Sequence, residues 1–183
     1  MANKQALREL QTRLAERMQA ARAKPRGQSW LAVECHGHGL LLPLEQAGEI
    51  FAMVPLLPVP HTRPWFAGVA NLRGGLHGVV DLARFLGLPD ALVTEAGRDQ
   101  ARLVALGAPL ALNVALLVDR LAGLRAIENL HADPDTEPDH GDPPGAARPA
   151  FAPVRWRDNE GRSWQALDLA ALAHDVRFLS IVA

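Results

Sequence analysis

Four side chains that could ligate a transition metal are Cys35, His36, His38 and His77. Thiolate and imidazole are the ligands that zinc prefers. On a strand, however, residues 36 and 38 face one way and residue 35 the other. The chain also has no C-x-x-C or H-E-x-x-H pairing. A polar hairpin turn beside a half-buried thiol is therefore the favoured interpretation, and a metal-binding small barrel is the alternative.

Nucleophilic catalysis would need a nucleophile held in a strained turn beside a base and an acid. The serines of the chain are Ser29, Ser163 and Ser180, and each lacks the G-x-S-x-G setting. No pair of acids stands out along the chain. The sequence therefore predicts no enzyme and no cofactor.

The charge balance argues against a nucleic-acid partner. Among 183 residues 19 are basic and 20 acidic, so the formal net charge is −1, and the chain lacks the broad positive field that binds phosphate backbones. Single-strand-binding barrels also stack bases on aromatic side chains, whereas this chain has no tyrosine and 5% aromatic residues. Trp65, Trp156 and Trp164 are expected to pack in the core or at its rim, and a nucleic-acid-binding module is kept only as an alternative.

The sequence favours a cytoplasmic protein without direct membrane insertion. A single cysteine, Cys35, excludes an internal disulfide and suits a reducing compartment. The start of the chain is charged and has no apolar signal core. The longest uncharged apolar run, Leu103 to Val118, is interrupted by Gly107, Pro109 and Asn113. That run is too short and too broken to span a membrane and is expected to form a buried hairpin.

The segment from Gly68 to Leu82 is the most suitable for recognition by another protein. Strand-favouring apolar residues surround the pair Gly74-Gly75, which predicts a hairpin or tight bend at that pair. Arg73 would then lie at the rim, where its planar guanidinium could bind a carboxylate or the carbonyls of another chain. On turn chemistry alone, an ordinary solvated turn arginine is favoured over a binding residue.

An amphipathic helix is predicted over residues 1–25, because apolar residues recur there at helical spacing and Pro25 and Gly27 close the segment. If residues 2–23 are all helical, the helix is about 33 Å long. Globular helices commonly carry such a stripe, so packing on the same domain is favoured over binding a partner. The stripe consists of Leu7, Leu10, Leu14, Met18 and Ala21.

Two β-hairpins are predicted in the rest of the chain. The first joins Trp30–Glu34 to Leu40–Leu44, and the second joins Arg102–Leu106 to Leu110–Val118. Glu45–Phe51 is expected to be a strand end or a short helical turn. The prolines that follow it favour an extended surface segment. They are Pro55, Pro58, Pro60 and Pro64.

A short capped helix follows each hairpin. Asp81 and Asp168 stand at N-cap positions before similar Leu-Ala stretches, and Gly87 stands where a C-cap is expected, which predicts a first helix of about two turns. This repeat predicts two similar lobes, the second carrying an insertion. The insertion is the loop 131–150, whose acidic and proline-rich composition predicts a flexible segment.

The order of these motifs resembles the CheW family of chemotaxis adaptors, over residues 28–182. The resemblance is carried by Glu49-Ile50, the proline-rich stretch, Gly68-Val69-Ala70-Asn71-Leu72-Arg73-Gly74, Val79-Val80-Asp81-Leu82 and Leu117-Val118-Asp119. The N-terminal helix, the acidic insertion and the ending from Trp164 are more similar to the PilI-type adaptors of type IV pilus systems than to the shorter flagellar adaptors. A CheA kinase or a CheV-type protein would need further domains that 183 residues do not hold.

The resemblance implies a mostly β fold with two SH3-like β-barrel lobes around a shared core. It also implies a scaffold that joins the cytoplasmic tip of a methyl-accepting chemoreceptor to the regulatory domain of a CheA-type histidine kinase. The positions that match the receptor-binding residues of the family are Ala47, Glu49, Gly68, Asn71 and Arg73. The positions that match its kinase-binding region are Leu103 and Ala115, where Ala115 replaces a usual glycine.

Overall fold

The computed structural model describes residues 29–89, 99–133 and 149–183. The predicted N-terminal helix and most of the predicted loop 131–150 lie outside these residues. Residues 131 and 132, which the loop was expected to include, instead pair as a strand with β10. No helix in the described part of the chain is long and apolar enough to cross a membrane.

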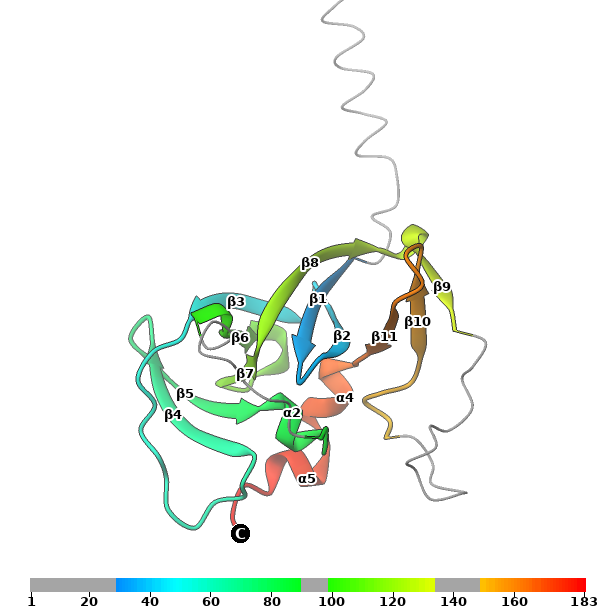
Figure 1. Cartoon of the computed structure of the whole chain (residues 1–183). Coiled ribbons are helices and arrows are strands. Elements are labelled where there is room, and N and C mark those ends of the chain that lie inside the picture. The colour runs from blue at the N-terminus through cyan, green and yellow to red at the C-terminus, as the bar shows by residue number, and fades with distance from the viewer. Residues whose placement is uncertain (1–28, 90–98, 134–148) are drawn as a thin grey trace, which may run out of the picture.

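The described chain folds into two sheets (Figure 1). The six-stranded sheet contains, in spatial order, β8 (Arg120–Ala126), β1 (Ser29–Cys35), β2 (His38–Pro43), β11 (Ser163–Ala166), β10 (Arg155–Asp158) and β9 (Leu130–Ala132). The five-stranded sheet contains β3 (Ala47–Ala52), β6 (Arg102–Leu106), β7 (Val114–Val118), β5 (Gly75–Asp81) and β4 (Phe66–Leu72). This arrangement confirms the predicted mostly β fold with two lobes.

Strand alternation distributes the apolar residues among three packed clusters. Along β1, Trp30 and Ala32 face the interior of the six-stranded lobe, whereas Leu31, Val33 and Cys35 face the core shared by both lobes. The five-stranded lobe has its own interior around Leu72, Val79 and Leu103. Because side chains point alternately to the two faces of a strand, the central strands are buried on both faces and hold the two lobes together.

The two lobes exchange strands between the halves of the sequence. The first hairpin, β1–β2, joins the late strand β11 through the parallel pairing of Gln165 with Leu40. The second hairpin, β6–β7, joins the earlier strand β5 through a parallel pairing that includes Val79 and Ala115. The predicted repeat of hairpin and capped helix is therefore present. In each copy of the repeat, however, the hairpin lies in one sheet and the strand that precedes the capped helix lies in the other sheet.

Three short α-helices lie where the lobes meet, α2 (Leu82–Phe85), α4 (Leu169–Ala173) and α5 (Val176–Leu179). The predicted N-caps are present, since the Asp81 carboxylate accepts from the Arg84 N–H and the Asp168 carboxylate accepts from the N–H groups of Ala170 and Ala171. α2 has four residues and is shorter than predicted. The chain leaves it through Gly87, which has a φ of 68°.

The second hairpin also differs from its prediction. β7 begins at Val114 rather than Leu110, because residues 108–110 form the 3-10 helix η1 and Ala111 adopts a φ of 53°. Of the two alternatives expected for Glu45–Phe51, the strand is confirmed, since Ala47–Ala52 form β3. A second 3-10 helix, η2, covers Ile127–Asn129.

A buried hydrogen-bond network fixes the β10–β11 hairpin. The indole N–H of Trp164 donates to Asp158 Oδ2 at 2.8 Å, and the backbone N–H groups of Glu160 and Arg162 donate to Asp158 Oδ1 at 3.0 Å. Burial by itself would raise the pKa of Asp158, but these hydrogen bonds hold that pKa below its usual range. The ionised carboxylate is therefore the form that the fold stabilises.

We expect Asp158→Asn to lower the free energy of unfolding by about 1–3 kcal/mol at pH 7, because an amide cannot accept all three hydrogen bonds. A carboxylate whose folded pKa is depressed contributes stability that is present above about pH 4 and is lost as the pH falls through the folded pKa. Urea unfolding between pH 7 and pH 3 checks this, with the exposed Glu160→Gln as control. Equal stability losses at pH 7 and pH 3 would contradict the assignment.

Candidate functional site

An exposed ion pair links the two opposite edges of the five-stranded sheet. Arg73 Nη2 lies 2.6 Å from Glu49 Oε1, with 76% and 41% of the two side chains exposed. Glu49 is on the edge strand β3, and Arg73 follows the opposite edge strand β4. Two of the residues predicted to bind a receptor are thus brought together from opposite edges. An exposed pair adds only about 0–1 kcal/mol to stability.

The backbone at Arg73 is strained. Arg73 and Gly74 are the two central residues of the β4–β5 turn, with φ values of 49° and 84°. The bend therefore lies one residue earlier than predicted, and Gly75 belongs to β5. Two-residue turns with two positive φ values favour asparagine or glycine at the first position, so arginine is unfavourable there on local grounds. Strain of this kind is common at functional sites.

Asn71 stabilises this turn rather than extending freely into solvent. Its side-chain oxygen accepts a hydrogen bond from the Gly74 N–H at 2.8 Å. On the next strand, Leu76 pairs with Asn71 and is exposed. Ile50, which follows Glu49 on β3, is exposed as well. We call Glu49, Ile50, Asn71, Arg73 and Leu76 the Arg73 surface.

Leu76 and Ile50 were not selected as site residues from the sequence. The signal for Leu76 was its register with Asn71, but this register requires the turn at Arg73-Gly74 to be placed correctly. The signal for Ile50 required β3 to be recognised as an edge strand. Both leucine and isoleucine otherwise look like ordinary core residues of a β protein.

Gly68 and Ala47 lie beneath the surface rather than on it. Gly68 has a φ of 132°, and a Cβ built there would be 2.4 Å from the Leu57 carbonyl oxygen. Leu57 and Val69 exchange two backbone hydrogen bonds at this point, so Gly68 lets the proline-rich segment lie against β4. Ala47 is half-buried and packs against the shared core. These two positions shape the lobe that carries the Arg73 surface.

Leu103 and Ala115, the positions expected to meet a kinase, are fully buried in the five-stranded lobe. Their side chains pack with Val79 and Leu72 and are not available for contact with another protein. The expectation of direct contact by these side chains does not fit their burial. The physical reason is alternation, which turns both residues toward the interior.

The cysteine and histidine cluster is dispersed. The Cys35 thiol is buried in the shared core, and this burial, together with Asp119, raises its pKa, so that the thiolate needed for metal binding is disfavoured. The imidazole of His36 lies 3.0 Å from the Pro89 carbonyl oxygen and that of His77 lies 3.0 Å from the Gly75 carbonyl oxygen. Within the described residues no three acidic, cysteine or histidine side chains are grouped to hold a metal ion.

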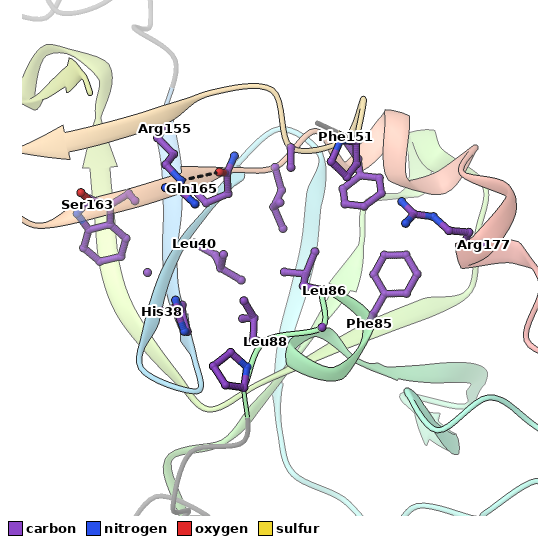
Figure 2. A pocket seen from close by; sticks show the side chains of 17 residues that line it. His38, Leu40, Phe85, Leu86, Leu88, Phe151, Arg155, Ser163, Gln165 and Arg177 are labelled. Atoms are coloured by element: carbon purple, nitrogen blue, oxygen red, sulfur yellow. Dashed lines mark hydrogen bonds between the residues drawn. The ribbon is translucent and has the colours of Figure 1, made fainter. Parts of the chain in front are cut away.

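A second surface feature is a hollow of about 600 Å³ between α2 and the strands β2 and β11, lined by both apolar and polar side chains (Figure 2). Its floor includes Leu40 and Leu86, and the aromatic rings of Phe85 and Phe151 lie at one side. Arg155 and Arg177 contribute to its rim. Phe85, Phe151, Phe178 and Trp65 form a cluster of edge-to-face, tilted and stacked ring pairs, with ring centroids 5.2–6.4 Å apart.

Comparison with known families identifies the fold. Residues 29–177 match the family model described as the CheW-like domain. The chain belongs to the CheW-like domain family. The matched region includes both sheets and the Arg73 surface, so the family pattern and the exposed ion pair lie in the same part of the molecule.

A solved structure supports the same fold. The chain is similar to the scaffolding protein TtCheW from Thermoanaerobacter tengcongensis, with a TM-score of 0.63 and 16% sequence identity, covering 85% of this chain and 97% of that protein. At this identity the likeness concerns the fold. A comparison with curated protein sequences finds no match.

We expect Gly68→Ala to destabilise the protein by about 1–3 kcal/mol, because the new Cβ would collide with the backbone of Leu57 at a positive φ. Gly74→Ala is the matched control, since its φ is also positive but no atom lies within 4 Å of its Cβ position. Thermal unfolding of both variants tests this. Equal losses at the two positions would mean that conformational strain, and not the close approach of Leu57, explains Gly68.

Proposed function

We propose that the protein is a non-catalytic adaptor of the cytoplasm that couples methyl-accepting chemoreceptors to a CheA-type histidine kinase. The observation that carries this proposal is the exposed Arg73–Glu49 pair on a CheW-like domain. The pair adds little stability because both side chains are exposed, and Arg73 occupies a turn position that favours asparagine or glycine, so recognition explains its placement better than folding does. Membership of the family supports a scaffold rather than an enzyme.

The Arg73 surface suits the side of a helical hairpin such as a receptor tip. Ile50 and Leu76 offer exposed apolar contacts, and Arg73 and Glu49 offer one positive and one negative group beside them. An amphipathic helix can bury its apolar residues on such a surface and fix its register through charge-assisted hydrogen bonds. No part of this mechanism requires a reacting group.

We further propose that the adaptor serves a type IV pilus system and twitching motility. The support is the predicted amphipathic N-terminal helix, the acidic proline-rich insertion 131–150 and the ending from Trp164, which together resemble PilI-type adaptors. A flagellar chemotaxis adaptor is the second candidate, since the CheW-like domain itself is common to both. Recruitment to receptor arrays at the membrane would follow from receptor binding in either case. Comparing capture by receptor tips from the two systems distinguishes them.

We expect Arg73→Ala to weaken binding to a receptor-tip fragment by about 2 kcal/mol, or about thirty-fold, if the guanidinium is central to the contact. The melting temperature should change little because the side chain is exposed. Calorimetric titration and a thermal scan measure the two quantities. The control is Arg84→Ala, since Arg84 is an exposed arginine of α2 that pairs with Asp81. Unchanged receptor binding by Arg73→Ala would remove Arg73 from the site.

We propose that Leu103 and Ala115 affect the kinase only by shaping the packing of the five-stranded lobe. Leu103→Ala should lower the free energy of unfolding by about 2–5 kcal/mol because it leaves a cavity. Ala115→Leu should lower it by about 1–3 kcal/mol because it overpacks the same interior. Kinase capture should persist at temperatures at which each variant is folded, as checked by circular dichroism. Loss of capture at a temperature at which circular dichroism shows the variant to be folded would instead indicate direct contact.

A further inference from the structure

The face of the six-stranded sheet that covers the shared core continues beyond that core at one corner. Leu31 pairs with Leu42 on one side and with Leu124 on the other, so these three share a face. Leu31 and Leu42 are buried, but Leu124 is 61% exposed. The apolar residues of this face therefore continue along β8 from the buried core to the solvent-exposed surface.

Ser29 lies at the centre of that exposed corner. Its carbonyl accepts a hydrogen bond from the Leu44 N–H at 2.9 Å, and it pairs with Ala126 on β8. Alternation places Ser29, Leu44 and Ala126 on the same face as Leu31. Leu44 is 41% exposed. We call Leu44, Leu124 and Ala126, arranged around Ser29, the Ser29 shelf.

Acidic residues border the Ser29 shelf. Glu45 follows Leu44 directly, Glu128 stands two residues after Ala126, and both are exposed. Arg125, the nearest cation on β8, belongs to the opposite face, where its guanidinium lies 5.3 Å from the centre of the Trp164 ring. The shelf is therefore an apolar strip with negative edges.

Residues 1–28, which lead into Ser29, have the opposite charge to the edges of the shelf and carry apolar residues that could cover it. Residues 1–28 hold seven basic and two acidic residues, whereas the rest of the chain holds twelve basic and eighteen acidic ones. The same segment carries the apolar stripe from Leu7 to Ala21. Residues 24–28 could extend over about 17 Å, and Pro25 and Gly27 are suited to a reversal of the chain before Ser29.

We propose that residues 2–23 form an amphipathic helix that packs against the Ser29 shelf of the same molecule. The stripe covers Leu44 and Leu124, and the arginines on either side of the stripe meet Glu45 and Glu128. The hollow lined by Leu40 and Leu86 is a poorer partner for this segment, because it adjoins His38 at the start of β2, whereas the shelf adjoins the end of β2, beside Ser29, where the segment joins the domain.

Paramagnetic relaxation tests this arrangement in the full chain. Thr12→Cys places a nitroxide on the side of the predicted helix opposite to the stripe, and the buried Cys35 does not compete for the label. We expect loss of intensity at the backbone amides of Leu44, Leu124 and Ala126. Leu10→Ser with Leu14→Ser should abolish this loss. So should Glu45→Lys with Glu128→Lys, which changes only exposed side chains and leaves the core intact. Val176→Ser, which alters an exposed apolar residue elsewhere, should leave it unchanged.

Three results would overturn the proposal. The first is full amide intensity at the shelf in the labelled protein. The second is intensity loss at Leu40 and Leu86, which line the hollow, instead of at the shelf. The third is intensity loss at the shelf only when a spin-labelled molecule is mixed with a separate isotope-labelled one, since the segment would then bind a second copy.

Discussion

Two parallel strand pairings determine the architecture of this protein. β2 pairs with β11, and β7 pairs with β5. Each pairing joins strands from different halves of the sequence, so neither lobe is complete until both halves of the chain are present. The central strands then have one face in their own lobe and the other in the shared core, which leaves no surface along which the lobes could separate without exposing Leu31, Val80 and Leu116.

The same constraint explains where recognition can occur. Residues of the central strands are needed on both faces for packing, and Leu103 and Ala115 are examples of positions that the fold has already used. Residues of edge strands and turns are not needed for packing on both faces. The Arg73 surface is built from the edge strand β3 and from the hairpin that contains the opposite edge strand β4, so its side chains can be substituted while the core stays unchanged.

The sequence was informative where the physical cause is local. Aspartate capping predicted α2 and α4, and β-strand patterns with glycine turns predicted both hairpins, because each depends on residues only a few positions apart. The exchange of strands between lobes depends on pairings such as Gln165 with Leu40, which no local pattern specifies. The position of the Arg73 turn was predicted one residue too late because Gly75 looked equally suited to a positive φ. The helix α5, capped by Asp175, was missed because no Leu-Ala stretch like those after Asp81 and Asp168 follows its cap.

Arginine–glutamate contacts occur in both lobes, but their surroundings give them different roles. In the six-stranded lobe, Arg120 donates two hydrogen bonds of 2.6 Å to Glu34, and Arg162 from the β10–β11 turn lies 2.5 Å from the same carboxylate. Only 9% of the Glu34 side chain is exposed. Removing one partner of such a group would leave a buried charge poorly compensated, so this contact holds β1, β8 and the turn in place. The Arg73–Glu49 pair also links a hairpin turn to a distant strand, but water surrounds it, and a partner can replace either half of the contact at little cost to the fold. Burial therefore makes the first contact structural, whereas exposure leaves the second available for binding.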